Sequence, residues 1–113
     1  MDAAVDTVKK LFDGKINVLS GVMADKDYDY ITSRIALIAD KVYCVTPDNS
    51  RSLPAKDYAN AFEKQGITAY AFDTMDKAMT AAYNDSKKEN RPLLGLGSLY
   101  MYCEFVDALN KLK

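Results

Sequence analysis

Strand-like and helix-like apolar patterns alternate along the whole of this 113-residue chain. Short apolar runs that are typical of buried strands lie near 16–20, 42–46, 69–72 and 93–97, and a segment with helical spacing separates each run from the next. Strands that are joined by single helices pair in parallel through right-handed crossovers. The alternation therefore predicts an α/β fold in which helices flank a mainly parallel sheet of about four strands.

The helical segments also have recognisable ends. Apolar spacing and capping residues predict helices over 3–12 and 27–38, from Pro54 to about Lys64, from Asp73 or Thr74 onward, and from Ser98 onward. The polar residues 84–88 are predicted to form a frayed, solvated helix end. Because the first helical pattern precedes the first strand, we expect the fold to start with a helix. A chain of this length allows one compact domain, here a three-layer domain of the Rossmann-like type.

The charge balance and the hydropathy pattern exclude several classes of protein. Fifteen basic and sixteen acidic residues leave a net charge of −1, which provides no electrostatic footprint for nucleic acid or for an anionic membrane surface. The apolar runs are far shorter than the ~20 residues that span a bilayer, and no secretion-signal pattern follows Met1. We therefore expect a cytoplasmic protein without nucleic-acid or membrane partners.

The sequence offers few groups for catalysis or metal binding. It contains no histidine, which removes the commonest general base and the commonest metal ligand. Cys44 and Cys103 lie far apart without zinc-type spacing, and each falls in an apolar pattern, so both are expected to be buried free thiols. The lysines, aspartates and tyrosines form no base–nucleophile constellation. We predict neither a metal site nor catalytic residues in this chain.

Three loops nevertheless hold residues suited to binding a ligand. In an open parallel sheet, ligands bind at the loops that follow the carboxyl ends of the strands. The three are loop A (20–26), loop B (46–53) and loop C (97–100). If the strands, numbered in chain order, lie side by side in the order 4-1-2-3, loops A and C leave neighbouring strands and can share a site.

Each loop has a binding interpretation and a structural one. Lys26 lies near a helix N-terminus, which is unfavourable for a cation unless an anion binds there; otherwise it is a surface lysine beside capping aspartates such as Asp27. Arg51 can hold a carboxylate or phosphate bidentately, or lie in a solvated turn. In loop C, a glycine and Ser98 can present amides to an anion, or serve packing and capping. The glycine spacing there matches neither a P-loop nor a dinucleotide fingerprint.

Three stretches, 21–27 (GVMADKD), 51–55 (RSLPA) and 97–100 (GSLY), occur together in an order and spacing that resemble a known family. Through essentially all of its length, the chain resembles the C-terminal domain of folylpolyglutamate synthases, including bifunctional dihydrofolate synthases, in the Mur ligase superfamily. The resemblance implies an ATP-dependent amide ligase. Such an enzyme activates a carboxylate of folate or of its glutamate tail as an acyl phosphate, which the amine of L-glutamate attacks to form a γ-linked amide.

The resemblance also implies roles for individual residues. Lys26 and Ser98 match contacts to carboxylates of the incoming L-glutamate, and Phe105 matches an aromatic wall nearby. The remaining members of the candidate substrate-binding set, which lie within the matching stretches, are Asp27, Arg51 and Tyr100. The implied partners are L-glutamate, folate and an ATP-binding domain of the same protein, which carries ATP and magnesium. No cofactor is expected to bind this chain alone.

One departure from the family concerns the start of the chain. The family's C-terminal domain begins with a strand leading into an Asp-Gly-Ala-His-Asn-Pro segment, and this chain starts about where that segment ends. We therefore expect residues 1–113 to be a glutamate ligase domain without its first strand and its upstream ATP-binding domain, inactive as a ligase alone. The alternative is a stand-alone α/β module that binds a small anion or a protein. An in-phase copy of that segment upstream in the gene would favour the first interpretation, and an upstream stop codon the second.

Overall fold

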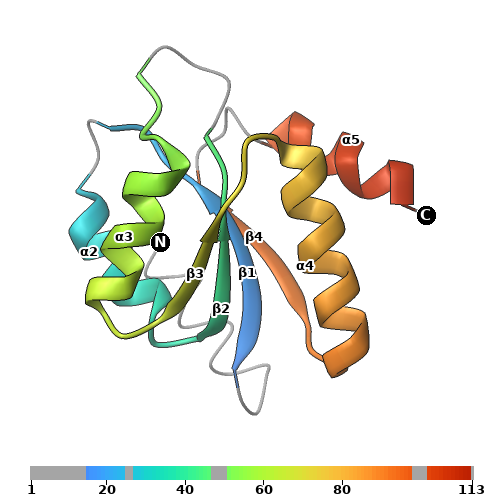
Figure 1. Cartoon of the computed structure of the whole chain (residues 1–113), viewed down its shortest axis with the longest axis horizontal. Coiled ribbons are helices and arrows are strands. Elements are labelled where there is room, and N and C mark those ends of the chain that lie inside the picture. Colours follow the sequence, from blue (N-terminus) through green and yellow to red (C-terminus); the bar gives the residue numbers. More distant parts are fainter. Residues whose placement is uncertain (1–14, 25–26, 47–50, 98–101, 113) are drawn as a thin grey trace.

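The computed structural model of the chain describes residues 15–24, 27–46, 51–97 and 102–112 (Figure 1). In chain order its elements are β1 (Ile16–Gly21), α2 (Tyr28–Ile35), β2 (Ala39–Cys44), α3 (Ala55–Lys64), β3 (Thr68–Ala71), α4 (Met75–Glu89), β4 (Leu93–Gly97) and α5 (Tyr102–Leu112). The predicted alternation of strands and helices is confirmed.

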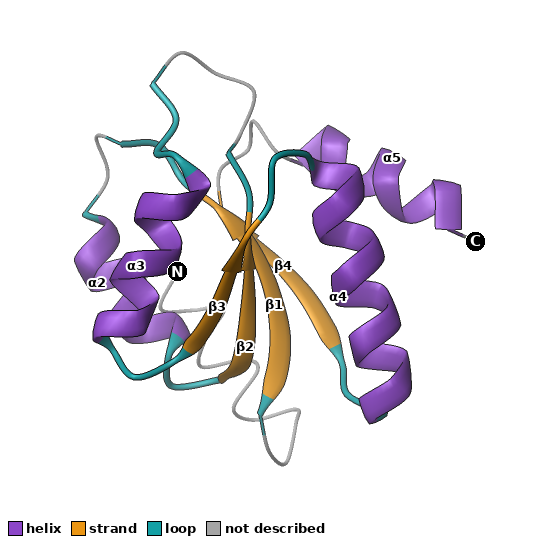
Figure 2. Ribbon diagram, viewed as in Figure 1, coloured by secondary structure: helices purple, strands orange, loops and turns teal. Residues whose placement is uncertain are grey.

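The strands form one four-stranded sheet in the order β3-β2-β1-β4, and all three pairings are parallel. Helices α2 and α3 lie on one side of the sheet and α4 and α5 on the other, which makes three layers (Figure 2). The α/β fold class is therefore the predicted one. The order also makes β1 and β4 neighbours, which is the arrangement that a shared site for loops A and C requires.

The two cores follow from the alternation of side chains along β1. Ile16 and Val18 face the α2–α3 side, where they pack with Tyr58 and Phe62 of α3. Leu19 faces the opposite side and belongs to a second cluster around α4. Helix α3 begins after Pro54 and ends before Gly66, whose φ of 80° is readily adopted only by glycine.

Three predictions about the first part of the fold are wrong. The first described element is strand β1, so the description of the fold as starting with a helix does not match the structure; the segment 3–12, on which that helix was predicted, lies outside the described residues. Strand β2 runs over Ala39–Cys44 rather than 42–46, because Ala39 already pairs with Ile16 of β1. The helix predicted over 27–38 accordingly ends at Ile35.

Helix α4 is longer and better anchored than its sequence suggested. Thr74 caps it as predicted, since its side chain accepts a hydrogen bond from the Lys77 amide. The prediction of a frayed end over 84–88 is wrong, because the helix continues to Glu89 and Asn90 closes it in the left-handed conformation. Side chains of this last stretch contact the sheet, which explains why the helix does not fray.

Among the described helices, none combines the length and apolarity needed to cross a membrane. Within the same part of the chain, no group of three or more Cys, Asp or Glu side chains is arranged to hold a metal ion.

Candidate functional site

The carboxyl ends of β1 and β4 meet at one place on the sheet edge. Gly21, the last residue of β1, pairs in register with Gly97, the last residue of β4. Loops A and C therefore start from adjacent points, as the strand order requires. Lys26 and Ser98, the two residues expected to share a binding site there, lie outside the described residues, so their convergence stays a prediction.

Loops A and B are joined to each other by backbone hydrogen bonds. The Ala24 amide donates to the Arg51 carbonyl at 2.7 Å, and the Leu53 amide donates to the Val22 carbonyl at 2.9 Å. Between these two bonds, residues 23 and 52 form an isolated antiparallel bridge. We call residues 22–24 and 51–53, held together in this way, the clasp. Sequence reasoning missed it, because backbone pairing between two short loops leaves no residue pattern.

The clasp is anchored in the core. Val22, Met23 and Leu53 are buried, whereas Arg51 is exposed beside them. The apolar side chains hold the backbone of both loops against the sheet, and the Arg51 backbone is fixed through its carbonyl. Loop B is also tied at its base, since the Ala55 amide at the start of α3 donates to Thr46 Oγ1 at 2.9 Å. The Arg51 side chain thus projects from a fixed segment of backbone.

Asp27 caps helix α2. Its carboxylate accepts a hydrogen bond from the Tyr30 amide at 3.2 Å, and its side chain is exposed. This is the capping role that the sequence offered as the alternative to binding. A contact between Asp27 and a substrate remains a prediction.

A buried hydrogen bond lies directly below loops A and B. Ser20 Oγ and Tyr58 Oη are 2.8 Å apart, and both residues are fully buried. Burial raises the pKa of Tyr58 well above its ordinary value, and the hydrogen bond to Ser20 opposes part of that rise. Tyr58 belongs to the first turn of α3 and Ser20 to the end of β1, so the bond joins the two elements that carry the clasp.

Of the remaining predicted residues, one prediction is confirmed and the others fall outside the part of the chain whose side chains are described. Cys44 is a buried free thiol, as expected, and burial raises its pKa to about 12. Tyr100 lies outside the described residues. Phe105 and Cys103 fall within α5, but their side chains are outside the described part of the chain.

Comparison with known proteins assigns the chain to a family. The sequence profile of a family described as “Mur ligase, glutamate ligase domain” matches residues 1–99. The chain belongs to this family. It is 30% identical over 102 residues to a folylpolyglutamate synthase of Lacticaseibacillus casei, a match that covers 89% of this chain and 22% of that relative.

Solved structures of larger enzymes share the fold of this glutamate ligase domain. Escherichia coli FolC in complex with DHPP and ADP has a TM-score of 0.75 and 20% identity, with 96% of this chain and 26% of that one covered. Helicobacter pylori folylpolyglutamate synthetase has a TM-score of 0.75 and 18% identity, with 97% and 26% covered. The chain thus spans about a quarter of the length of these proteins.

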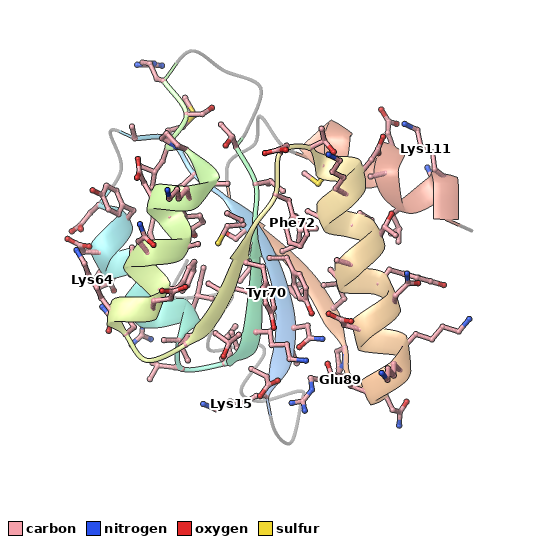
Figure 3. All side chains as sticks on the ribbon, in the orientation of Figure 1. Lys15, Lys64, Tyr70, Phe72, Glu89 and Lys111 are labelled. Atoms are coloured by element: carbon pink, nitrogen blue, oxygen red, sulfur yellow. The ribbon has the colours of Figure 1, made fainter. Side chains whose placement is uncertain are left out.

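A second polar cluster of the domain lies at the other end of the sheet, between β1, β2 and α4. The Asn17 amide donates to Ser86 Oγ at 3.0 Å and to Glu89 Oε1 at 3.2 Å. Lys41 pairs with the other oxygen of Glu89, so the amide and the ammonium share one carboxylate. Figure 3 shows Glu89 near the end of α4. Because Lys41 binds it, the pKa of Glu89 is lowered, while the same contact raises the pKa of Lys41.

Tyr43 extends this cluster along the α4 face. Its hydroxyl donates to Asp85 Oδ2 at 2.7 Å, and its ring lies 5.6 Å from that of Tyr70. Burial raises the pKa of Tyr43 strongly, and the Asp85 contact adds to the rise. The Tyr43–Asp85 hydrogen bond and the contacts of Asn17 and Lys41 with Ser86 and Glu89 together hold α4 to the sheet.

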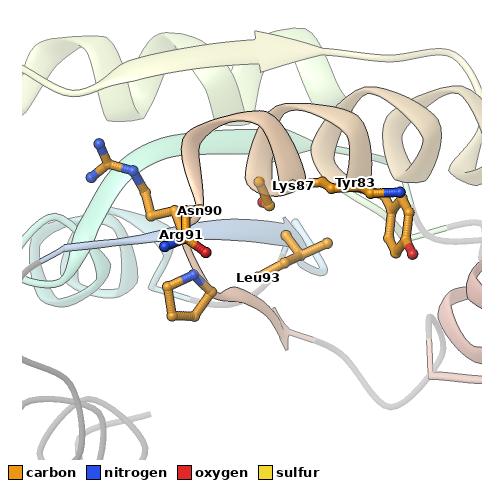
Figure 4. A pocket seen from close by; sticks show the side chains of 7 residues that line it. Tyr83, Lys87, Asn90, Arg91 and Leu93 are labelled. Atoms are coloured by element: carbon orange, nitrogen blue, oxygen red, sulfur yellow. The ribbon is translucent and has the colours of Figure 1, made fainter.

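A cavity of about 520 Å³ also lies at this end, where α4 ends and β4 begins (Figure 4). The residues that line it are Tyr83, Ser86, Lys87, Asn90, Arg91, Pro92 and Leu93. Arg91 extends away from Tyr83 and Leu93 and lies 3.7 Å from Asp40, so its charge is directed out of the cavity. Since the strands are parallel, the cavity lies at the opposite end of the sheet from the three loops.

Proposed function

We propose that this chain is the C-terminal domain of an ATP-dependent folylpolyglutamate synthase and that it positions the incoming L-glutamate for γ-linked amide formation on folate or dihydrofolate. The observation that carries the proposal is the pairing of Gly21 with Gly97, from which loops A and C depart together. Membership of the glutamate ligase domain family and the similarity to the Lacticaseibacillus casei folylpolyglutamate synthase support it.

The proposed site binds L-glutamate through the charges of its two carboxylates. L-glutamate carries two carboxylates, and each needs donors that replace its hydration. We assign one set of donors to the Lys26 ammonium and the other to Ser98 of loop C, which precedes the last helix in the chain. The free amides and the dipole at the N-terminus of a helix favour an anion. Arg51 on the clasp is assigned as a further cation, and Asp27, Tyr100 and Phe105 complete the expected wall of the site.

The residues described here do not suit a nucleotide–metal centre. The chain has no histidine, the glycine-containing loop C lacks the lysine and the glycine spacing of a P-loop, and the described acidic side chains do not gather into a group that could hold a metal. We therefore assign ATP and magnesium to an ATP-binding domain of the parent protein. Escherichia coli FolC was solved with ADP and a Yersinia pestis enzyme with AMPPNP and a Mn ion, in keeping with this assignment.

The chain's own contribution to the reaction is then binding and orientation. Held by its carboxylates at the loops, L-glutamate presents its amine to an activated folate carboxylate on the ATP-binding domain. Positioning of this kind converts an encounter of two substrates into a reaction within one complex. Because phosphoryl transfer takes place on the other domain, the isolated chain is expected to bind L-glutamate weakly and to catalyse no ligation.

L-glutamate titration of the 113-residue chain by NMR tests the proposal. Replacing a charged hydrogen-bonding partner costs roughly tenfold in affinity, so Lys26→Ala is expected to weaken binding by about that factor. Lys64→Ala is the matched control, because Lys64 is exposed at the far end of α3. The Lys64→Ala variant should bind L-glutamate with the same affinity as the unmodified chain. Equal affinities of Lys26→Ala and the unmodified chain, or tight ATP binding by the chain alone, would overturn the assignment.

A further inference from the structure

The Ser20–Tyr58 hydrogen bond joins the two elements from which the clasp extends. Ser20 precedes Gly21 at the end of β1, where loop A begins. Tyr58 lies in the first turn of α3, which starts where loop B ends. The bond therefore fixes the distance between the base of loop A and the base of loop B at a point just below the clasp.

The surroundings of this pair are apolar. On the same side of the sheet lie Val18, Val22 and Phe62, and the Tyr58 ring is 4.8 Å from that of Phe62. A phenylalanine facing an alanine or valine would fill such a place without burying two hydroxyl groups. A buried hydroxyl pair contributes little net stability, because each group loses its hydration, but it permits only a narrow range of geometries.

The bonds above the pair depend on that geometry. The Ala24 amide reaches the Arg51 carbonyl, and the Leu53 amide reaches the Val22 carbonyl, only when the two loops keep one register. A change in the separation of β1 and α3 would shift loop B along loop A, and with it the Arg51 side chain.

We propose that Ser20 and Tyr58 are positioning residues that set the register of the clasp, and through it the placement of the loops that bind L-glutamate. The part concerning L-glutamate rests on the proposed function, whereas the part concerning the clasp does not. Neither residue touches the ligand. Both act through the backbone of residues 22–24 and 51–53.

Amide hydrogen exchange of the 113-residue chain tests the effect on the clasp. In Tyr58→Phe, exchange at the Ala24 and Leu53 amides should accelerate about tenfold relative to amides in the centre of β1, as expected for loss of one buried hydrogen bond. Tyr43→Phe is the matched control, because it removes a hydroxyl that donates to Asp85 on the opposite face of the sheet. In that variant the ratio of clasp to strand exchange should stay unchanged.

A double-mutant cycle connects the result to the bond itself. Once Ser20→Ala has removed the partner, adding Tyr58→Phe should change clasp exchange little further. If Tyr58→Phe accelerates exchange equally at the clasp and across the sheet, the pair is a general core contact and the proposal is wrong.

L-glutamate affinity gives the second measurement. Tyr58→Phe should weaken binding several-fold under conditions where the chain remains fully folded, and Tyr43→Phe should leave it unchanged. A loosened clasp with unaltered L-glutamate affinity would overturn the link between the clasp and the ligand. Absence of binding to the unmodified chain would instead overturn the proposed function, and the exchange ratio would still decide whether Ser20 and Tyr58 set the register of the clasp.

Discussion

Strand β1 buries two polar side chains that serve different purposes. Asn17 faces α4 near the start of the strand, where it joins a cluster that includes the charged pair Lys41–Glu89. Ser20 faces α3 near the end of the strand, where it forms a hydrogen bond with the neutral hydroxyl of Tyr58. Both residues are fully buried. They differ in the charge of their partners and in their distance along the strand from the loops.

The comparison distinguishes a cluster that holds α4 to the sheet from a pair that lies beneath the candidate binding loops. The Asn17 cluster contains ionised groups, so it should respond to pH and should govern how firmly α4 is held to the sheet. The Ser20–Tyr58 pair contains none and lies under the loops, so it should respond little to pH and should govern the clasp. Burial of polar groups alone does not indicate function, whereas their position relative to the strand ends does.

The largest effect is expected from Asn17→Ala. The change leaves a void in the core and removes the donor to Ser86 and Glu89, which should lower the free energy of unfolding by about 2–3 kcal/mol. Urea denaturation at neutral pH measures the loss. L-glutamate affinity, measured where the variant is folded, should stay unchanged, and a parallel loss of affinity would show that the two ends of β1 are not independent.

Tyr58→Phe and Tyr43→Phe should rank next. Loss of the Tyr58 hydroxyl leaves Ser20 buried without its partner, at a cost of about 1–2 kcal/mol in unfolding free energy. Loss of the Tyr43 hydroxyl should cost less, about 0.5–1 kcal/mol, because Asp85 is only partly buried and water can replace the donor. Parallel urea denaturation curves measure both values. A larger loss in Tyr43→Phe would contradict the ranking.

The Lys41–Glu89 pair makes a prediction about acid. The pKa of Glu89 is lower in the folded chain than in the unfolded one, so its stabilising contribution is complete above the ordinary carboxyl pKa and is lost as the pH falls through the folded value. The Glu89→Gln variant should therefore lose less stability than the unmodified chain between neutral pH and pH of about 3. Thermal unfolding over that range measures the difference. The same dependence of stability on pH in the two proteins would contradict a stabilising Lys41–Glu89 pair.

The smallest effect is expected at an exposed ion pair. Lys111 and Asp76 lie 3.0 Å apart across α5 and α4, but their side chains are 67% and 59% exposed, against 25% and 26% for Lys41 and Glu89. Lys111→Ala should change the unfolding free energy by no more than about 0.5 kcal/mol. Calorimetry at low and moderate salt measures it. A larger change would mean that the exposure of an ion pair is a poor guide to its contribution to the unfolding free energy.

The sequence predicted the architecture because the apolar runs of β1 and β4 and the spacing of Tyr58 and Phe62 are local signals of strand and helix. It misplaced the start of β2 because Asp40 and Lys41 look like turn residues until Arg91 and Glu89, far along the chain, lie beside them. A local sequence pattern carries no information about partners that lie far along the chain.

The same limit applies to the polar clusters. Residues 84–88 looked solvated because Asn17 and Tyr43, which contact Ser86 and Asp85, come from distant strands. Loops A, B and C could be chosen from sequence, since a parallel sheet directs attention to its strand ends. The clasp between loops A and B could not, because backbone amides and carbonyls pair without regard to side-chain identity.

A residue-by-residue NMR map of L-glutamate binding to the unmodified chain tests the central claim most directly. We expect chemical shift changes to concentrate at residues 21–27 and 51–53 and at the end of β4, while the signals of Asn17, Tyr83 and Arg91 at the opposite end of the sheet remain unchanged. Shift changes centred on the cavity lined by Tyr83 and Arg91, with the clasp unaffected, would contradict it.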